Sequence, residues 1–145
     1  MLLECRCSRS MVVQLYAIVL AHFIQNGEVH MTTHMIHELL LTLGIGRQYL
    51  GHSITVEAIT MVIRDENCLL CVKHGIFQPL ADKRSCDWRT IERNMRTVIH
   101  RAWTFNTDRL MELAVYPLRR EPTVTEFLDI LSSYMMRQSP RRMAR

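Results

Sequence analysis

Glycine and proline are scarce in this chain. Only five glycines and four prolines occur among 145 residues, so few positions interrupt a helix. Because strand-and-turn architectures need frequent turn residues, this scarcity favours long helices and predicts an all-α fold. Apolar residues make up 48% and charged residues 22% of the chain, which excludes a disordered polymer and indicates one domain with a hydrophobic core.

A hydrophobic run long enough to cross a membrane is also lacking. The apolar segment 11–24 is shorter than the roughly 20 residues that span a bilayer, and Gln14, Tyr16 and His22 interrupt it. Arginines precede it as in a signal peptide, but a small-x-small cleavage pattern is missing. We therefore expect a helix that is buried or faces a partner, with membrane insertion as the alternative.

The cysteines do not form an even set. Five cysteines give no paired disulfide framework, which indicates a reducing, cytoplasmic location. Cys68 and Cys71 have the spacing of half a zinc site, and Cys5 with Cys7 could supply the other half. Because Cys68 and Cys71 lie in an apolar run, packing as small hydrophobes is the favoured interpretation, and we expect no metal or other cofactor. Three histidines at helical spacing lack an HExxH motif and are interpreted as a solvated helix face: His30, His34 and His37.

Apolar spacing and helix-ending residues predict the order of the helices. Residues 1–30 are expected to form an extension whose apolar helix ends at residues 26–27, Asn-Gly. A second helix, capped by Thr32 or Thr33, is expected to end at Gly44, since glycine accepts the left-handed conformation that closes a helix. Domain boundaries follow as 1–30 for the extension, 31–137 for the main domain and 138–145 for a basic tail.

Further helices complete the main domain. Ser53 is expected to cap one that breaks at residues 65–67. Another covers about 107–115 and is expected to turn three residues inward: Leu110, Met111 and Ala114. Thr123 and Glu126 have the spacing of a capping box, which predicts the start of the last helix. Its apolar face consists of Phe127, Ile130, Leu131 and Tyr134.

The predicted helix from Trp88 to Trp103 is the most informative stretch. A short helix over about 77–84 precedes it, with Pro79 tolerated in the first turn, and a tight connection follows in which Asp87 can cap the long helix. Apolar and basic residues fall on opposite faces of the cylinder. The apolar stripe is Ile91, Met95, Val98 and Ala102, and the basic ridge is Arg89, Arg93, Arg96 and His100. This layout is typical of a helix-turn-helix.

The basic ridge suggests duplex DNA as the partner. The planar guanidinium group of arginine pairs with guanine in the major groove and also binds phosphates. A net charge of +4 with a pI of about 9.0 is compatible with a polyanionic partner. Glu92 lies within one turn of the arginines, so it can orient them or accept from a cytosine amino group. Residues placed to bind phosphates are Lys83, Arg84 and Ser85 at the turn and His100 on the ridge. A solvated helix face with ion pairs of its own remains the alternative.

The stretch from about Thr33 to Arg137 resembles the C-terminal effector domain of the sporulation initiation response regulator family. The resemblance is carried by Leu43-Gly44-Ile45, Gly51, Glu57-Ala58-Ile59-Thr60-Met61-Val62, Leu80-Ala81, Ile91-Glu92-Arg93-x-x-Arg96-x-x-Ile99-x-x-Ala102-Trp103 and Pro122-Thr123-x-x-Glu126-Phe127. It implies a six-helix effector domain, preceded here by an extra N-terminal apolar helix. The third and fourth helices of that domain form the helix-turn-helix of a cytoplasmic transcription factor, which binds short promoter boxes, often in tandem.

The resemblance also implies which residues read bases. The family's base-contacting positions fall on Glu92, Arg93 and Arg96, and one further family arginine falls where this chain has Thr90. Arg89 precedes Thr90 but is turned about 100° around the helix, so it cannot replace that arginine directly. We therefore expect the DNA preference of this chain to depart from its relatives at Thr90.

The N-terminus departs further from the family. Its members carry a phosphoacceptor receiver domain there, an α/β unit with clustered acidic residues, and residues 1–30 show neither a sheet pattern nor an acidic cluster. Phosphorylation control and a receiver-bound metal are therefore expected to be absent. The first helix is expected to mediate self-association or to pack on the domain, unless the chain is a fragment.

Three classes of function follow. The leading one is a sequence-specific DNA-binding regulator of sporulation or stationary-phase genes, binding promoter boxes as a homodimer or in tandem copies, with no membrane and no small-molecule substrate. The alternative is a protein–protein module that pairs with a full-length regulator through the apolar N-terminal helix. An enzyme is the least supported class, because no triad, phosphate loop or paired carboxylates occur and His74 and His100 lack an evident chemical partner.

Overall fold

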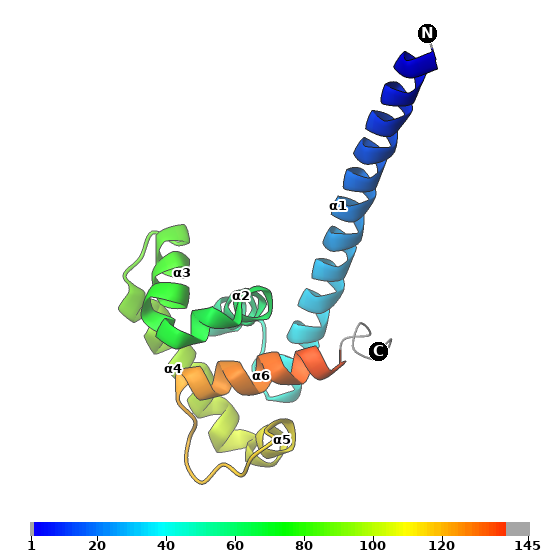
Figure 1. Ribbon diagram of the computed structural model, residues 1–145. Helices are drawn as coiled ribbons and strands as arrows, with labels where there is room; N and C mark the ends of the chain where they lie inside the picture. Colours follow the sequence, from blue (N-terminus) through cyan, green and yellow to red (C-terminus); the bar gives the residue numbers. More distant parts are fainter. Residues whose placement is uncertain (1, 139–145) are drawn as a thin grey trace. The chain divides into compact units, whose positions relative to one another are not determined.

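The structure, a computed structural model, describes residues 2–138 (Figure 1). Within the first helix, side chains are described for residues 13–22, for Gly27 and from residue 30 on. All regular secondary structure in the described part of the chain is helical, with no strand, which confirms the all-α fold.

The helical segments follow one another with short connections. They are α1 (Leu2–Thr42), α2 (Leu50–Arg64), the 3-10 helix η1 (Glu66–Cys71), the π-helix η2 (Lys73–Phe77), α3 (Gln78–Lys83), α4 (Trp88–Phe105), α5 (Thr107–Leu113) and α6 (Val124–Gln138). Contacts divide the chain between Thr32 and Thr33, so that the second unit holds the end of α1 and all later helices.

Helix α1 does not stop at Asn26-Gly27, contrary to the sequence expectation. It continues from Leu2 to Thr42, and no new helix starts at Thr32 or Thr33. A glycine inside a helix costs only about 1 kcal/mol relative to alanine, and no proline follows to force a break. The Asn-Gly pair is therefore tolerated within a long run of helix-forming residues.

The end of α1 is closed by Gly44, as the sequence predicts. Gly44 has φ of +80°, and its amide donates to Leu41 while the Ile45 amide donates to the carbonyl of Leu40 at 3.0 Å. This pairing is the Schellman motif, which satisfies carbonyls that a helix end leaves without partners. Two side chains from α4 and its end supply further donors: Arg101 Nε to Gly44 O at 3.0 Å and Asn106 Nδ2 to Leu43 O at 2.7 Å.

Helix α2 begins at Leu50, after the N-cap Tyr49, which is four residues earlier than a cap at Ser53 predicts. Ser53 lies inside the helix, and its hydroxyl donates to the Leu50 carbonyl at 3.1 Å instead of accepting from an amide. Gly51, just after the start, is buried where α2 packs against α4. A Cβ atom at Gly51 would lie 2.8 Å from the Asn94 carbonyl oxygen, so the missing side chain permits the close approach of the two helices.

The core of the second unit is built around α2, α4 and α6. Helix α2 packs against both α4 and α6, and α4 also contacts α3 and α5 (Figure 1). The largest fully buried side chains come from most of these elements: Phe127, Ile36, Leu40, Leu43, Ile45, Ile54, Ile59, Ile76, Ile91, Met95, Ile99 and Leu110. Burial of this apolar surface, at about 25 cal/mol per Å², is the main stabilising contribution to the unit.

Two expectations for the C-terminal helices have different outcomes. Met111 on α5 is exposed, not inward, because Leu110 and Leu113 are the residues that reach the core and Ala114 is half-buried after the helix ends. The capping box of α6 is confirmed: the Thr123 amide donates to Glu126 at 2.7 Å and the Glu126 amide donates to the Thr123 hydroxyl at 3.3 Å.

The predicted break at residues 65–67 is confirmed as well, since Asp65 ends α2 and caps η1.

Candidate nucleic-acid interface

Helix α4 has one buried and one exposed face. The predicted apolar stripe is buried, together with Ile99: Ile91, Met95, Val98 and Ala102. Asp87 caps the helix, accepting from the Arg89 amide at 2.8 Å, as the sequence predicts. The cap and the buried stripe together fix which side chains of α4 face outward.

A tight turn joins α3 to α4. The Ser85 amide donates to Asp82 at 3.3 Å, the Cys86 amide donates to Ala81 at 3.0 Å, and Ser85 has φ of 52°. These are the bonds of a Schellman motif, with serine at the left-handed position where glycine is usual. Helix α3, this turn and α4 form the predicted helix-turn-helix.

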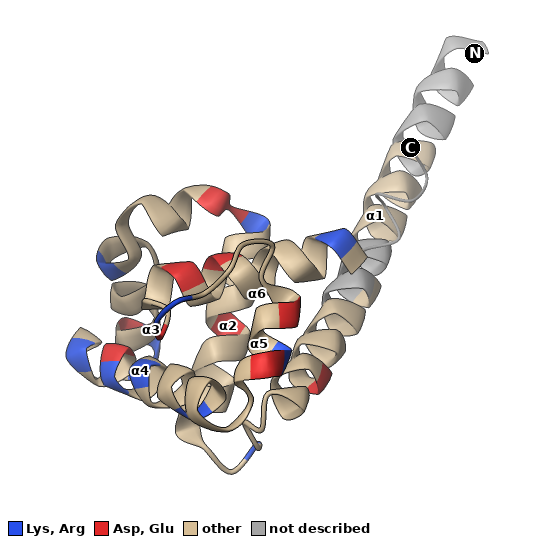
Figure 2. Ribbon diagram, turned by 90° about the horizontal axis from the view of Figure 1, so that it is seen from below, with Lys and Arg blue, Asp and Glu red and all other residues tan. Residues whose placement is uncertain are grey.

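The exposed face of α4 borders an open hollow of about 440 Å³. Its lining combines four residues of the basic ridge with Glu92, Thr97 and, from the segment before α6, Glu121: Arg89, Glu92, Arg93, Arg96, Thr97, His100 and Glu121. Figure 2 shows basic residues recurring along the α4 ribbon. Four of the five residues assigned to base reading therefore share one surface; Thr90 does not line it.

One ion pair and one histidine–carboxylate hydrogen bond order this surface. Arg96 donates to Glu92 at 2.6 Å within α4, and His100 lies 3.0 Å from the Glu121 carboxylate through Nδ1. Among the side chains that the structure describes, no ion pair engages Arg93, so its guanidinium is available to an incoming partner. The Arg96–Glu92 pair matches the orienting role that the sequence suggests for Glu92.

Thr90 and Arg89 lie at the start of α4. Thr90 is half-buried, and its carbonyl accepts from Asn94 Nδ2 at 2.8 Å. Arg89 lies over the ring of Trp88, 5.4 Å from its centroid, and Lys73 lies over the same ring at 4.5 Å. Cation–π contacts of this kind hold two basic groups beside the first turn of α4.

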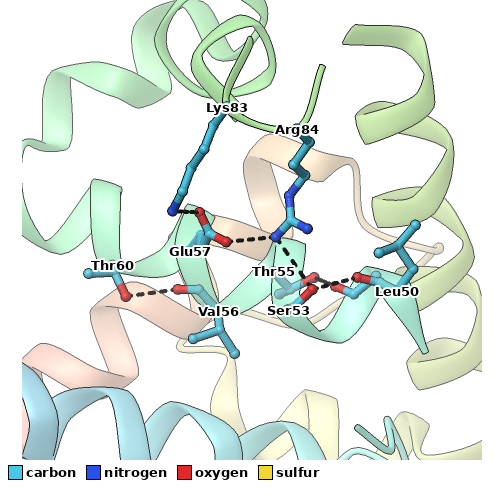
Figure 3. Close-up of polar contacts among 9 residues, drawn as sticks. Leu50, Ser53, Thr55, Val56, Glu57, Thr60, Lys83 and Arg84 are labelled. Atoms are coloured by element: carbon cyan, nitrogen blue, oxygen red, sulfur yellow. Dashed lines mark hydrogen bonds and ion pairs between the residues drawn. The ribbon is translucent and has the colours of Figure 1, made fainter. Parts of the chain in front are cut away.

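The residues assigned to phosphate binding do not share one environment. Lys83 and Arg84 both pair with Glu57 on α2, at 2.8 and 2.6 Å (Figure 3). His100, by contrast, lies on the α4 surface next to Glu121. Ser85 is exposed at the turn. Arg137, the last residue of the predicted main domain, donates to the Leu113 carbonyl at 3.1 Å, and residues 139–145 of the predicted tail lie outside the described residues.

Three contacts around the assigned residues could not be predicted from the sequence: those made by Glu57, Lys73 and Glu121. Each of these residues contacts its partner from another element, at a sequence separation of more than ten residues. Helical periodicity relates residues within one helix only, so no local pattern could reveal these pairings.

Comparison with known protein families matches residues 36–135 to the family described as sporulation initiation factor Spo0A C terminal. The chain belongs to this family. The match covers the second unit from the end of α1 to α6 and confirms the resemblance drawn from the sequence. Membership in the Spo0A C-terminal family makes the chain a DNA-binding effector domain associated with transcription regulation in sporulation.

The described residues hold neither a membrane-spanning helix nor a metal-binding cluster. Among them no helix is long and apolar enough to cross a membrane, and no cluster of three or more histidine, cysteine or acidic residues could hold a metal ion. Cys68, Cys71 and Cys86 are free thiols, and the side chains of Cys5 and Cys7 lie outside the described part.

Proposed function

We propose that this chain is a sequence-specific DNA-binding transcriptional regulator of sporulation or stationary-phase genes, acting in the cytoplasm. The observation that carries the proposal is the outward face of α4, the second helix of the helix-turn-helix, whose start Asp87 caps. On this face Arg89, Arg93 and Arg96 border one open surface. A helix fits the major groove of B-DNA, and arginine presents two parallel donors to guanine there.

The roles of the individual residues follow from their positions. Arg93 and Arg96, with Glu92 orienting Arg96, are proposed to read base edges, and Arg89 and Thr90 are proposed to set the preference at the start of the helix. Lys83, Arg84, Ser85 and His100 are proposed to contact phosphates and fix the docking register. Promoter boxes are bound as tandem copies or by a homodimer. Residues 31–137 form the DNA-binding domain, with 1–30 as an extension and 138–145 as a basic tail.

A binding experiment with two arginine variants tests this proposal. A selection from random duplex DNA identifies a preferred box, and affinities for that box and a scrambled duplex are then compared. Arg93→Ala and Arg96→Ala are each expected to lose about 1–3 kcal/mol of discrimination, because each bidentate base contact is worth that much. Arg109→Ala, whose arginine pairs with Glu112 on α5, is the control and should keep full discrimination. Full discrimination in both α4 variants would refute the proposal.

A second candidate rests on the apolar N-terminal residues. Six large apolar side chains are exposed there in the single chain: Val13, Leu15, Tyr16, Ile18, Val19 and Leu20. A helix that is apolar around its circumference usually becomes buried against a partner. We propose as the alternative that this helix pairs with a full-length regulator while the chain binds DNA weakly or not at all. Hetero-oligomers that persist at high salt, with negligible DNA affinity, would favour it.

A further inference from the structure

The carboxylate of Glu57 holds two cations at once. Its Oε2 accepts from Lys83 Nζ at 2.8 Å and its Oε1 accepts from Arg84 Nη2 at 2.6 Å. Figure 3 shows Lys83 and Arg84 both directed from the end of α3 toward Glu57 on α2. Each oxygen of one carboxylate thus has its own positive partner, drawn from the turn that precedes α4.

The two cations differ in how firmly they are held. The Arg84 side chain is 24% exposed and also lies 3.4 Å from the Ser53 hydroxyl through Nη2. The Lys83 side chain is 69% exposed and has Glu57 as its one ion-pair partner within the described chain. An exposed lysine pair is weakened by water and side-chain entropy, whereas a half-buried arginine with two acceptors is retained.

A duplex would bring phosphates against the same turn. Phosphate oxygens attract an ammonium group at least as well as a carboxylate does, and a lysine on four flexible carbons can change partner without moving the backbone. Arg84 cannot exchange its partner in the same way, because this would leave its half-buried guanidinium and the half-buried Glu57 carboxylate without each other as ion-pair partners. Any contact of Arg84 with a phosphate must therefore be made while it stays bound to Glu57, and only Lys83 is free to exchange its ion-pair partner.

Resting on the proposed DNA-binding function, we propose that Glu57 is an internal competitor for DNA phosphate. It keeps Arg84 as a fixed link between α2 and the turn, and it releases Lys83 when DNA docks. Glu57 thereby lowers the affinity for DNA of any sequence by the same factor, without touching the base-reading residues.

A double-mutant cycle on DNA binding tests the competition. The full chain and the variants Glu57→Gln, Lys83→Gln and the double variant are titrated with a random-sequence duplex at one fixed salt concentration. Glu57→Gln is expected to bind about twofold to fivefold more tightly than the unaltered chain, the range that corresponds to a released surface ion pair. In the Lys83→Gln background the same change is expected to have almost no effect, because the cation that it frees is gone.

Glu66→Gln is the matched control. Glu66 is exposed at the start of η1 and takes part in none of the ion pairs of the described chain, so its replacement removes one negative charge without freeing Lys83. A gain in Glu57→Gln no larger than in Glu66→Gln, or a gain that is equal in both Lys83 backgrounds, would overturn the proposal. A loss of affinity in Glu57→Gln would overturn it too.

A measurement on the unaltered chain covers the case in which Glu57→Gln does not fold. Lys73 and Lys83 are the two lysines of the sequence, so ¹⁵N-lysine labelling gives two ammonium signals, assigned with Lys73→Arg. The Lys83 signal is expected to shift when duplex is added, as its acceptor changes from carboxylate to phosphate. A Lys83 signal that stays in place on the saturated complex refutes the exchange, whereas a chain that binds no duplex at all refutes the proposed function and this inference with it.

Discussion

Ser85 carries the strain of the turn between α3 and α4. Its φ of 52° lies in the left-handed region, where a side chain costs roughly 1–2 kcal/mol that glycine does not incur. Serine tolerates the position better than a β-branched residue, whose two substituents on Cβ crowd the backbone. The angle at which α4 leaves the turn therefore depends on one residue in an uncommon conformation.

Substitutions at Ser85 are expected to separate by backbone preference. Ser85→Gly should leave the free energy of unfolding within about 0.5 kcal/mol, because relief of strain offsets the larger entropy of glycine in the unfolded chain. Ser85→Val should lower it by about 1–2 kcal/mol. Chemical denaturation of both variants measures the difference, and equal stabilities for glycine and valine would contradict a strained turn.

At the scale of elements, the contact between α2 and α4 depends on the absence of a side chain. Gly51 is buried, and a Cβ atom there would lie 2.8 Å from the backbone oxygen of Asn94. Backbone cannot rotate away as a side chain can, so the two helices would have to separate. Since α4 carries the candidate DNA-reading residues, their position depends on this approach.

Replacing Gly51 by alanine is expected to destabilise the fold by about 1–3 kcal/mol, the usual cost of overpacking. Gly27→Ala is a matched control, because a Cβ atom at Gly27 meets nothing within 4 Å. Alanine there should be neutral or stabilise α1 by up to about 1 kcal/mol through helix propensity. Thermal unfolding compares the pair, and a Gly51→Ala variant as stable as Gly27→Ala would show that the helices can move apart freely.

The position of Gly51 is an example of a feature that could not be predicted from the sequence. Periodicity predicted the buried stripe of α4, and local capping chemistry predicted the roles of Asp87 and Thr123, because each depends on neighbours a few residues away. The sequence pattern placed Gly51 before the start of the helix, because it predicted Ser53 as the helix cap. The packing of α2 on α4 decides between these alternatives, and it depends on residues more than 40 positions apart.

At the scale of the whole second unit, a pair of histidines links the end of α1 to α2. His52 is buried, and its Nδ1 must carry the proton because it lies 3.0 Å from the Ile45 carbonyl, which can only accept. Its Nε2 then accepts from Nδ1 of His37 at 2.7 Å. Two fully protonated rings could not keep this bond, since both facing nitrogens would be donors.

Stability of the unit is therefore expected to depend on pH. Burial, followed by the charges of His52, Arg47 and His34, lowers the pKa of His37 below its ordinary 6.5, while Glu38 acts in the opposite direction. The neutral ring is thus favoured in the folded state, and its contribution is complete above about pH 6.5 and lost as the pH falls through the lowered pKa. Thermal unfolding at pH 7.5 and pH 5.5 should show a lower Tm at the acidic value.

His37→Gln supplies the control for that comparison. Glutamine can still donate to His52 Nε2 but does not titrate, so the part of the Tm decrease that belongs to His37 should disappear. An unchanged pH dependence in this variant would show that the decrease arises elsewhere. The sequence predicted His37 as part of a solvated face, and it could not indicate the pairing because His52 lies fifteen residues away on another helix.

The donors at the far end of α4 limit how this helix can respond to DNA. Arg101 and Asn106 bind carbonyls at the end of α1, and the Arg101 guanidinium also lies against Tyr49 at 4.7 Å and Phe105 at 5.2 Å. Turning α4 about its own axis would break both hydrogen bonds and the Arg101–Tyr49 contact together, because their partners lie outside α4. Adjustment of this surface to DNA must then come from the side-chain rotamers of Arg89, Arg93 and Arg96, and α4 is expected to keep nearly the same rotation about its axis in the free and the DNA-bound domain.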